Sequence, residues 1–249
     1  MFKYRFLEAD RFTAGIILLL MFLSVVMTSC EKERYPEKTI PETSTMMDID
    51  SNIYVTVKIG DQWWMAEDLR TTRYKDGTPI NQLIDANNWS VSNQGAYCIY
   101  DGLSSAPGFL YNGYALENNA GLAPQGWRIP TDEDWKQLER HLGMSNPEQS
   151  SWRGDNQGDR LKLEGTTAWT RYGEVWGTNE SGFSAKAGGC RMPNGTWGTP
   201  GLFQTGFWWS STIKEAGQYW YRHLDYKRSD VFRYYGDANY GFAVRCVKE

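Results

Sequence analysis

The sequence predicts an α+β domain in which a mixed sheet is combined with two helices and a long glycine-rich loop region. Three observations predict this fold class. Residues 206–212 (GFWWSST) and 240–247 (YGFAVRCV) alternate bulky rings with small or polar side chains, as strands of a half-buried sheet do. Residues 53–65 have the pattern of an earlier hairpin, and an amphipathic helical pattern starts at Thr131. We expect residues 206–247 to form the sheet against which the rest of the chain packs.

The predicted hairpin starts at Ile53. Residues 53–59 are rich in β-branched side chains, Gly60 and Asp61 suit a tight turn, and residues 62–65 return with two tryptophans. The folded domain is therefore expected to span residues 53–249.

A helix is predicted immediately after Pro130. Thr131 and Asp134 have the spacing of a capping box, with Asp in place of the usual Glu, and Gly143 supplies a stop. Between them an apolar stripe recurs at helical spacing, formed by Trp135, Leu138 and Leu142. A second, shorter helix is expected within residues 155–163.

Residues 165–206 are rich in glycine and in turn-forming residues, without apolar periodicity. A long irregular stretch inside a compact domain is usually either functional or held by its own packing. We expect this loop region to carry any ligand site.

The first 29 residues are predicted to be a signal peptide, because basic residues precede an apolar run from 14 to 27. Residues 27–30 (MTSC) resemble a bacterial lipoprotein box, so Cys30 is the expected lipidation site. An ordinary secreted protein and an uncleaved anchor remain alternatives. Residues 30–52 are polar at first and contain Pro36 and Pro41, which favours a flexible tether carrying the lipidated cysteine. The expected location is the outer membrane or the cell surface.

Charge and composition exclude several kinds of site. The formal net charge is −4 and no basic run is present, which argues against nucleic acid as a partner. The only histidines are His141 and His223, and no CxxC pair exists, so neither a zinc site nor another metal site is predicted, and no cofactor is expected.

Three cysteines follow the predicted lipidation site: Cys98, Cys190 and Cys246. An exported protein can form disulfides. A bond between Cys190 and Cys246 is preferred, because each lies beside a glycine-rich strand of the same region. The alternative is three buried thiols that act as small hydrophobic side chains.

Several blocks in the same order resemble the Fibrobacter succinogenes major paralogous domain, which is common in exported proteins of Bacteroidetes. The blocks are IGDQWWMAEDL at 59–69, GWRIPT at 126–131, NESGF at 179–183, GG at 188–189, WWSS at 208–211 and YGFAVRC at 240–246. Cys190 departs from the family, where Tyr is more usual. The resemblance implies a fold similar to C-type lectins, whose long loop region binds ligands in some relatives. It implies no catalytic residues.

The expected function is that of a non-catalytic binding module for a glycan or another surface molecule. Aromatic planes stack on sugar rings while amide and carboxylate groups bind hydroxyls, which makes Asn179, Glu180, Trp197 and Trp209 the candidate ligand-binding residues. Each residue also has a structural interpretation as a core ring or a turn former. A calcium-dependent lectin site is not expected, because residues 192–194 (MPN) lack the acid of such a motif.

Two other functions stay open. One is a structural or fimbria-associated component that binds another protein. The other is an enzyme similar to the formylglycine-generating enzymes, whose reactive cysteines would correspond to Cys190 and Cys246.

Overall fold

The computed structural model describes residues 40–103 and 106–249, and residues Pro41–Glu249 form one compact unit. The predicted signal peptide and the predicted lipidation site at Cys30 lie outside the described residues. Within the described part no helix is both long enough and apolar enough to cross a bilayer.

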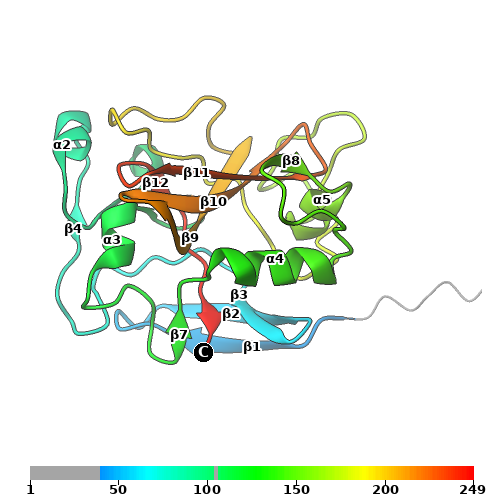
Figure 1. Cartoon of the computed structure of the whole chain (residues 1–249), viewed down its shortest axis with the longest axis horizontal. Helices are drawn as coiled ribbons and strands as arrows, with labels where there is room; N and C mark the ends of the chain where they lie inside the picture. Colours follow the sequence, from blue (N-terminus) through cyan, green and yellow to red (C-terminus); the bar gives the residue numbers. More distant parts are fainter. Residues whose placement is uncertain (1–39, 104–105) are drawn as a thin grey trace, which may run out of the picture. The chain divides into compact units, whose positions relative to one another are not determined.

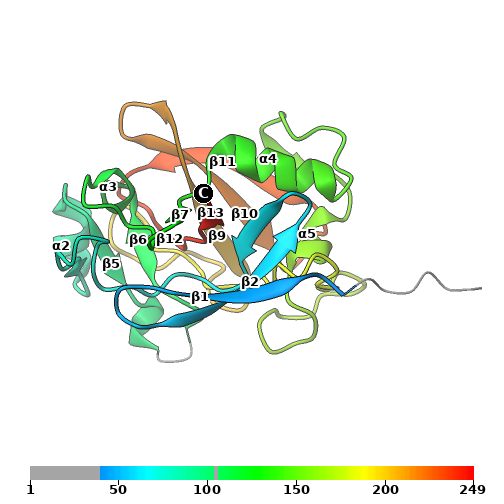
Figure 2. The ribbon, with the colours of Figure 1, turned by 90° about the horizontal axis from the view of Figure 1, so that it is seen from below.

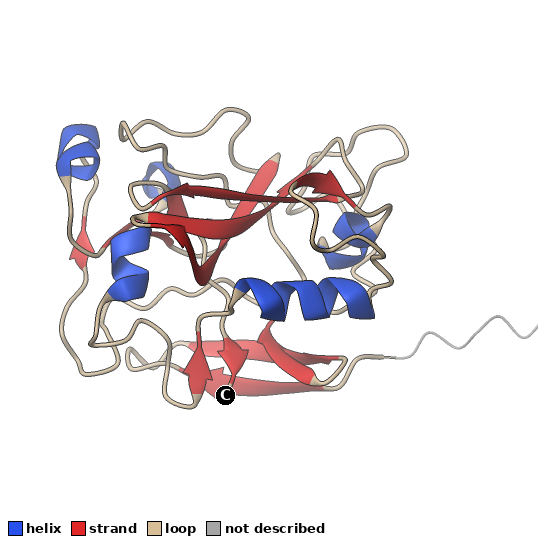
Figure 3. Cartoon of the chain, in the orientation of Figure 1, coloured by secondary structure: helices blue, strands red, loops and turns tan. Residues whose placement is uncertain are grey.

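The described residues form 13 strands in three sheets (Figure 1, Figure 3). The five-stranded sheet has the order β1 (Thr43–Met47), β2 (Ile53–Ile59), β3 (Gln62–Met65), β13 (Val247–Lys248), β7 (Trp127–Arg128). The first four-stranded sheet has the order β8 (Ser151–Arg153), β11 (Val231–Asp237), β10 (Gln218–Asp225), β9 (Thr205–Glu215). The second has the order β12 (Gly241–Phe242), β6 (Leu110–Asn112), β5 (Ala96–Cys98), β4 (Asn81–Gln82). Only β4 and β5 pair in parallel among these strands.

The helices in the described residues are short. They are α2 (Ala86–Val91), α3 (Gly113–Glu117), α4 (Asp132–His141), α5 (Gln157–Leu161) and the 3-10 turn Tyr100–Gly102. The predicted α+β class with a C-type-lectin-like mixed sheet and two helices is therefore wrong, because 14% helix and three sheets describe an all-β fold. The predicted class rested on the family resemblance together with the helix pattern at Thr131, but the two predicted helices, α4 and α5, have only ten and five residues.

The hairpin of residues 53–65 is confirmed as β2 and β3, which pair antiparallel around Gly60. The tether prediction is wrong for its last part. Residues of β1 pair with β2 over the register Thr43↔Val57 to Met47↔Ile53, and Figure 2 shows β1 lying along β2. The second predicted helix exists only as the five residues of α5. The folded part thus begins about ten residues earlier than the sequence predicts.

The stretch 206–247 is confirmed as strand-forming, but it supplies strands to all three sheets. Residues 205–237 give β9, β10 and β11, whereas β12 joins β6 and β13 joins both β3 and β7. The last strands therefore hold the three sheets together.

Helix α4 lies between the five-stranded sheet and the sheet of β8 to β11 (Figure 1). Its Trp135 packs against Trp64 of β3 with ring centroids 4.9 Å apart, and against Phe183 at 5.6 Å. Its acidic side faces arginines of the other sheet: Arg222 of β10 binds Glu139 (Nε–Oε1, 2.7 Å) and Asp132 (Nη1–Oδ1, 2.7 Å). The core between these sheets is thus aromatic on one side and ionic on the other.

Candidate ligand-binding site

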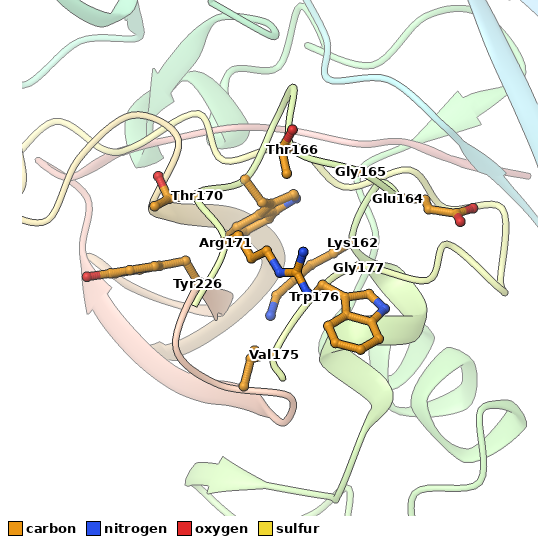
Figure 4. A pocket seen from close by; sticks show the side chains of 11 residues that line it. Lys162, Glu164, Gly165, Thr166, Thr170, Arg171, Val175, Trp176, Gly177 and Tyr226 are labelled. Carbon is orange, nitrogen blue, oxygen red and sulfur yellow. The ribbon is translucent and has the colours of Figure 1, made fainter. Parts of the chain in front are cut away.

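A cavity of about 240 Å³ lies between the glycine-rich loop and the end of β10 (Figure 4). Residues 164–177 form one wall, and Tyr226, just after β10, belongs to the other. The cavity lies just below the range of roughly 300–1,000 Å³ that is usual for small-molecule sites. It can therefore enclose one ring-sized group of a larger ligand.

Backbone hydrogen bonds fix the shape of this loop. The N–H of Thr170 donates to Phe203 O (2.7 Å), that of Leu163 to Ala185 O (2.8 Å) and that of Thr178 to Asp159 O (2.8 Å). Gly177 is required, because a Cβ atom there would lie 2.4 Å from the carbonyl oxygen of Leu163. The loop is irregular in backbone conformation, but it is held by its own packing.

Lys162 forms the floor of the cavity. Its Nζ donates to Asp159 Oδ1 (3.0 Å) and to the carbonyl oxygen of Arg228 (2.5 Å), and it lies 5.3 Å from the ring centre of Trp169. Burial lowers the pKa of Lys162, and the neighbouring Asp159 carboxylate opposes that shift. An ammonium group has three N–H donors. Two of these are used within the protein, and the side chain is only 1% exposed, so the ammonium group is enclosed beneath the cavity.

Aromatic rings line two sides of the cavity. Trp176 is 45% exposed, which is unusual for so large an apolar ring, and the Arg171 guanidinium lies 5.5 Å from its centre. Tyr226 is half-buried and meets Tyr172 edge to face at 5.8 Å. Figure 4 shows the side chains of Lys162 and Arg171 between those of Trp176 and Tyr226. The cavity thus combines exposed rings with N–H donors.

The four residues proposed from the sequence do not meet at one place. Asn179 has a positive φ of 47° and closes a turn, where its Oδ1 accepts from the N–H of Ser184 (2.8 Å). Glu180 is exposed and pairs with Arg160 (Nε–Oε2, 2.8 Å). Trp209 is fully buried, and its Nε1 donates to Tyr111 O (2.7 Å). Asn179 and Trp209 therefore have the structural roles that were their alternatives, whereas Glu180 forms an ion pair at the surface.

Trp197 is the exception among those four. It is half-buried, its ring packs on Tyr100 (4.6 Å between centroids), and it lines a different cavity near α2.

Sequence reasoning missed Trp176, Arg171 and Tyr226. Trp176 and Arg171 belong to the predicted glycine-rich stretch, and an aromatic ring in a segment without apolar periodicity was the signal that could have identified Trp176. Tyr226 gave no such signal, because its place beside the loop depends on tertiary structure.

The predicted disulfide between Cys190 and Cys246 is not formed. Cys98, Cys190 and Cys246 are all free and buried. Cys190 packs so closely against Gly198 that a Cβ at position 198 would lie 2.3 Å from its Sγ, whereas the N–H of Cys246 points to Met65 Sδ (3.2 Å). Each thiol is thus enclosed by other neighbours.

Burial raises the pKa of the cysteine thiols. For Cys98 and Cys190 it reaches about 12, and Cys246 shifts in the same direction. Nucleophilic cysteines need a low pKa, so this environment gives no support to the cysteine chemistry considered above. No group of three or more His, Cys, Asp or Glu side chains that could hold a metal occurs within residues 40–103 and 106–249.

Comparisons with known proteins give one match. The model of the Fibrobacter succinogenes major domain family matches residues 57–248, which covers all three sheets except β1 and the start of β2. No curated protein and no solved structure matches the chain. Since the family model spans more than half of the sequence, the chain belongs to the Fibrobacter succinogenes major domain family.

Proposed function

We propose that this protein is a non-catalytic, glycan-binding lipoprotein of the bacterial cell envelope, and that the sugar binds in the cavity between Trp176 and Tyr226. The observation that carries the proposal is the exposed Trp176 ring beside the exposed guanidinium of Arg171, in a cavity that is also lined by Lys162. Sugars present apolar ring faces and hydroxyl groups together. The aromatic side chains suit the apolar ring face, and the guanidinium N–H groups can donate to the hydroxyl oxygens.

A glycan array followed by titration calorimetry tests the site. We expect Trp176→Ala to weaken binding of the best glycan by about tenfold or more, since a lost aromatic contact removes on the order of 1–3 kcal/mol. Melting should stay within a few degrees of the parent, because Trp176 is already half exposed. The matched control is Tyr234→Ala, which removes a ring of similar exposure (39%) on β11. Equal affinities of the Trp176→Ala protein and the parent reject this cavity as the site.

A second candidate function is supported by one face of the sheet of β8 to β11. Trp152, Phe232, His223 and Phe207 are neighbours across these four strands and form a continuous, half-buried aromatic row. A flat aromatic face favours a protein partner over a small ligand. Tyr234 lies two residues from Phe232 on the same strand. Loss of a surface-protein partner in Tyr234→Ala, with glycan binding unchanged, would favour a structural or fimbria-associated role.

The proposed anchor is a lipid on Cys30, with the outer membrane or the cell surface as the location. More than one acyl chain is needed for firm anchoring, and bacterial lipoproteins carry several. We expect Cys30→Ser to abolish palmitate labelling and to release the protein from the membrane fraction. Cys98→Ala, which changes a buried thiol, should keep the label. A Cys30→Ser protein that still labels contradicts the anchor.

A further inference from the structure

Arg191 differs from every other fully buried arginine in the described residues. Arg153, Arg222, Arg233 and Arg245 each bind a buried carboxylate at 2.6–2.7 Å. Arg191 is 2% exposed and has no carboxylate within 4.0 Å among residues 40–103 and 106–249. Its Nη2 donates to the carbonyl oxygen of Ile84 (2.8 Å), while its buried Nε has no acceptor there. A positive charge is thus held inside the protein without a counter-ion.

Such an arrangement is energetically unfavourable, because an ion taken out of water loses several kcal/mol of solvation unless an opposite charge replaces it. The same fold supplies carboxylates to four other arginines, so the missing acid is particular to this position. A ligand carboxylate would complete the ion pair.

The backbone around Arg191 holds the side chain firmly in place. The backbone of Arg191 pairs with that of Trp197 across a tight turn and with that of Gly241 in β12. Arg191 and Gly241 exchange two backbone hydrogen bonds of 2.9 Å. The guanidinium carbon lies 4.2 Å from the Trp197 ring centre and 5.6 Å from that of Trp89. Position 241 has to be glycine, because a Cβ there would lie 2.7 Å from the Cβ of Arg191. The group is positioned in advance of any ligand.

Arg191 lines an open cavity of about 480 Å³, distinct from the one at Trp176. The half-buried ring of Trp197 forms part of its wall, and Gln82, Asp101 and Thr196 add polar groups. Asp101 is exposed and is the one acid among the lining residues. It repels a simple anion but accepts hydrogen bonds from hydroxyl groups.

We propose that this cavity binds a carboxylate-bearing sugar, a uronic acid unit, whose carboxylate pairs with Arg191 while the rest of the sugar lies against the half-buried side chain of Trp197. Arg is suited to this role, because its planar fork matches the two carboxylate oxygens. The hydroxyl groups of the sugar supply donors to Asp101. The site uses none of the residues of the Trp176 cavity, so it stands or fails independently of the proposed function above.

Titration calorimetry of the purified protein with tetragalacturonate and with its neutral methyl ester tests the inference. We expect the acid to bind at least about tenfold more tightly than the ester, since a charge-assisted hydrogen bond contributes on the order of 1.5–3 kcal/mol. Affinity for tetragalacturonate should fall as the salt concentration is raised from about 50 to about 500 mM, because dissolved ions screen charge–charge attraction increasingly strongly around and above roughly 0.1 M.

Two isosteric rim variants keep the test independent of folding. Gln82→Glu adds a negative charge, whereas Asp101→Asn removes one but keeps a side-chain oxygen that accepts from a hydroxyl group, and both side chains are exposed. Gln82→Glu should weaken tetragalacturonate binding about twofold to fivefold, and Asp101→Asn should strengthen it by a similar factor. Arg191→Lys keeps the charge but loses the fork, so binding should fall by about tenfold or more.

Equal binding of the acid and its ester, or equal affinities of the two rim variants, overturns the proposal. A short peptide with a free terminal carboxylate offers the same charge from another source, and its amide is the control. Binding of the peptide and not of tetragalacturonate overturns the assignment to a sugar.

Discussion

Asp68 and Arg245 are 177 residues apart in sequence and form a fully buried ion pair (Nε–Oδ1, 2.6 Å; side chains 1% and 0% exposed). The same carboxylate oxygen accepts from Trp208 Nε1 (2.9 Å), and Arg245 donates to the carbonyl oxygens of Phe183 and Ser184. One carboxylate therefore ties the first hairpin, the glycine-rich loop and the last strands together.

We predict that Asp68→Asn lowers the free energy of unfolding by about 3–5 kcal/mol, because it leaves the buried Arg245 charge without a partner. Urea denaturation followed by tryptophan fluorescence measures this. Glu133→Gln is the matched control, since Glu133 also binds an arginine at 2.6 Å but both partners are largely exposed. Its effect should stay below about 1 kcal/mol. Similar losses in the two variants would contradict the role given to burial.

The protonation of His223 should make the stability of the protein depend on pH. Its ring stacks on Phe207 (4.1 Å), and burial, with a smaller effect of the Lys162 charge, lowers its pKa to about 3. The unfolded chain binds the proton near pH 6.5 and the folded chain does not. The contribution of the neutral His223 to the free energy of unfolding is therefore fully present above pH 6.5, and it is lost progressively as the pH falls from 6.5 towards 3.

We expect the free energy of unfolding of the parent to fall by roughly 1–2 kcal/mol between pH 7 and pH 5, where most carboxylates stay ionised. His223→Phe keeps an aromatic ring in the row and should remove most of that fall. His141→Gln, which changes the only other histidine, should not. Parallel curves for the parent and His223→Phe over this range would disprove the assignment.

At single positions the sequence predicted burial better than ligand contact. Because successive strand residues face opposite sides, at least one of Trp208 and Trp209 had to be in the core, and the structure buries both. The Trp176 cavity could not be assembled from sequence, since Tyr226 lies 50 positions further along and nothing in the pattern brings it to the loop. The unpaired state of Arg191 is likewise a property of its surroundings, and the sequence shows only that arginine follows Cys190.

Among the elements, α4 was the most predictable, because its signals are local. The capping box is confirmed: Thr131 Oγ1 accepts from the N–H of Asp134 (3.1 Å), and Asp134 Oδ2 accepts from the N–H of Thr131 (2.7 Å). The helix begins at Asp132 as the pattern indicated.

Thr131→Ala should lower the free energy of unfolding by about 1 kcal/mol, the usual loss for an N-cap side chain, because the first turn of α4 then has an unsatisfied N–H. Thr131→Ser keeps the hydroxyl and should recover most of the stability. Thermal melting of the three proteins side by side is sufficient. If serine and alanine melt at the same temperature, the capping hydroxyl has no such role.

Strand β1 could not be predicted, and the reason is physical. Its five residues TSTMM are exposed except for Met46, so the strand has no buried face and no alternation of apolar side chains. It is held by backbone pairing with β2, which any sequence can make. The two-residue strands β4, β7, β12 and β13 leave no pattern for another reason, because they are too short to show a period. Elements that form through backbone pairing alone leave no pattern in the sequence.

At the scale of the whole molecule, the sequence predicted the strands better than their assembly. The sheets are joined by contacts between distant positions, such as Trp209 of β9 with Tyr111 of β6, 98 residues apart. Family resemblance identified the family correctly, but the fold class inferred with it was wrong. A single strong helix signal weighed more than many short strands, each of which is weak by itself.

The position at which the folded domain begins gives the last prediction. Besides pairing with β2, the segment before residue 53 supplies two carboxylates: Asp48 Oδ2 accepts from Tyr54 OH (2.6 Å), and Asp50 binds Arg73 (Oδ1–Nε, 2.6 Å) and the N–H of Thr72 (2.5 Å). We expect residues 41–249 to be a soluble, cooperatively folding protein. Residues 53–249, the domain expected from the sequence, should lose several degrees of melting temperature and aggregate, because the backbone edge of β2 is then uncovered.

An intermediate protein, residues 48–249, separates the two causes. It keeps Asp48 and Asp50 but lacks β1, so it should recover much of the melting temperature while still aggregating through the open edge of β2. Size-exclusion chromatography with light scattering reports the association, and calorimetry reports the melting. If residues 53–249 remain monomeric and melt with residues 41–249, then β1 is dispensable and the domain boundary predicted from the sequence is the better one.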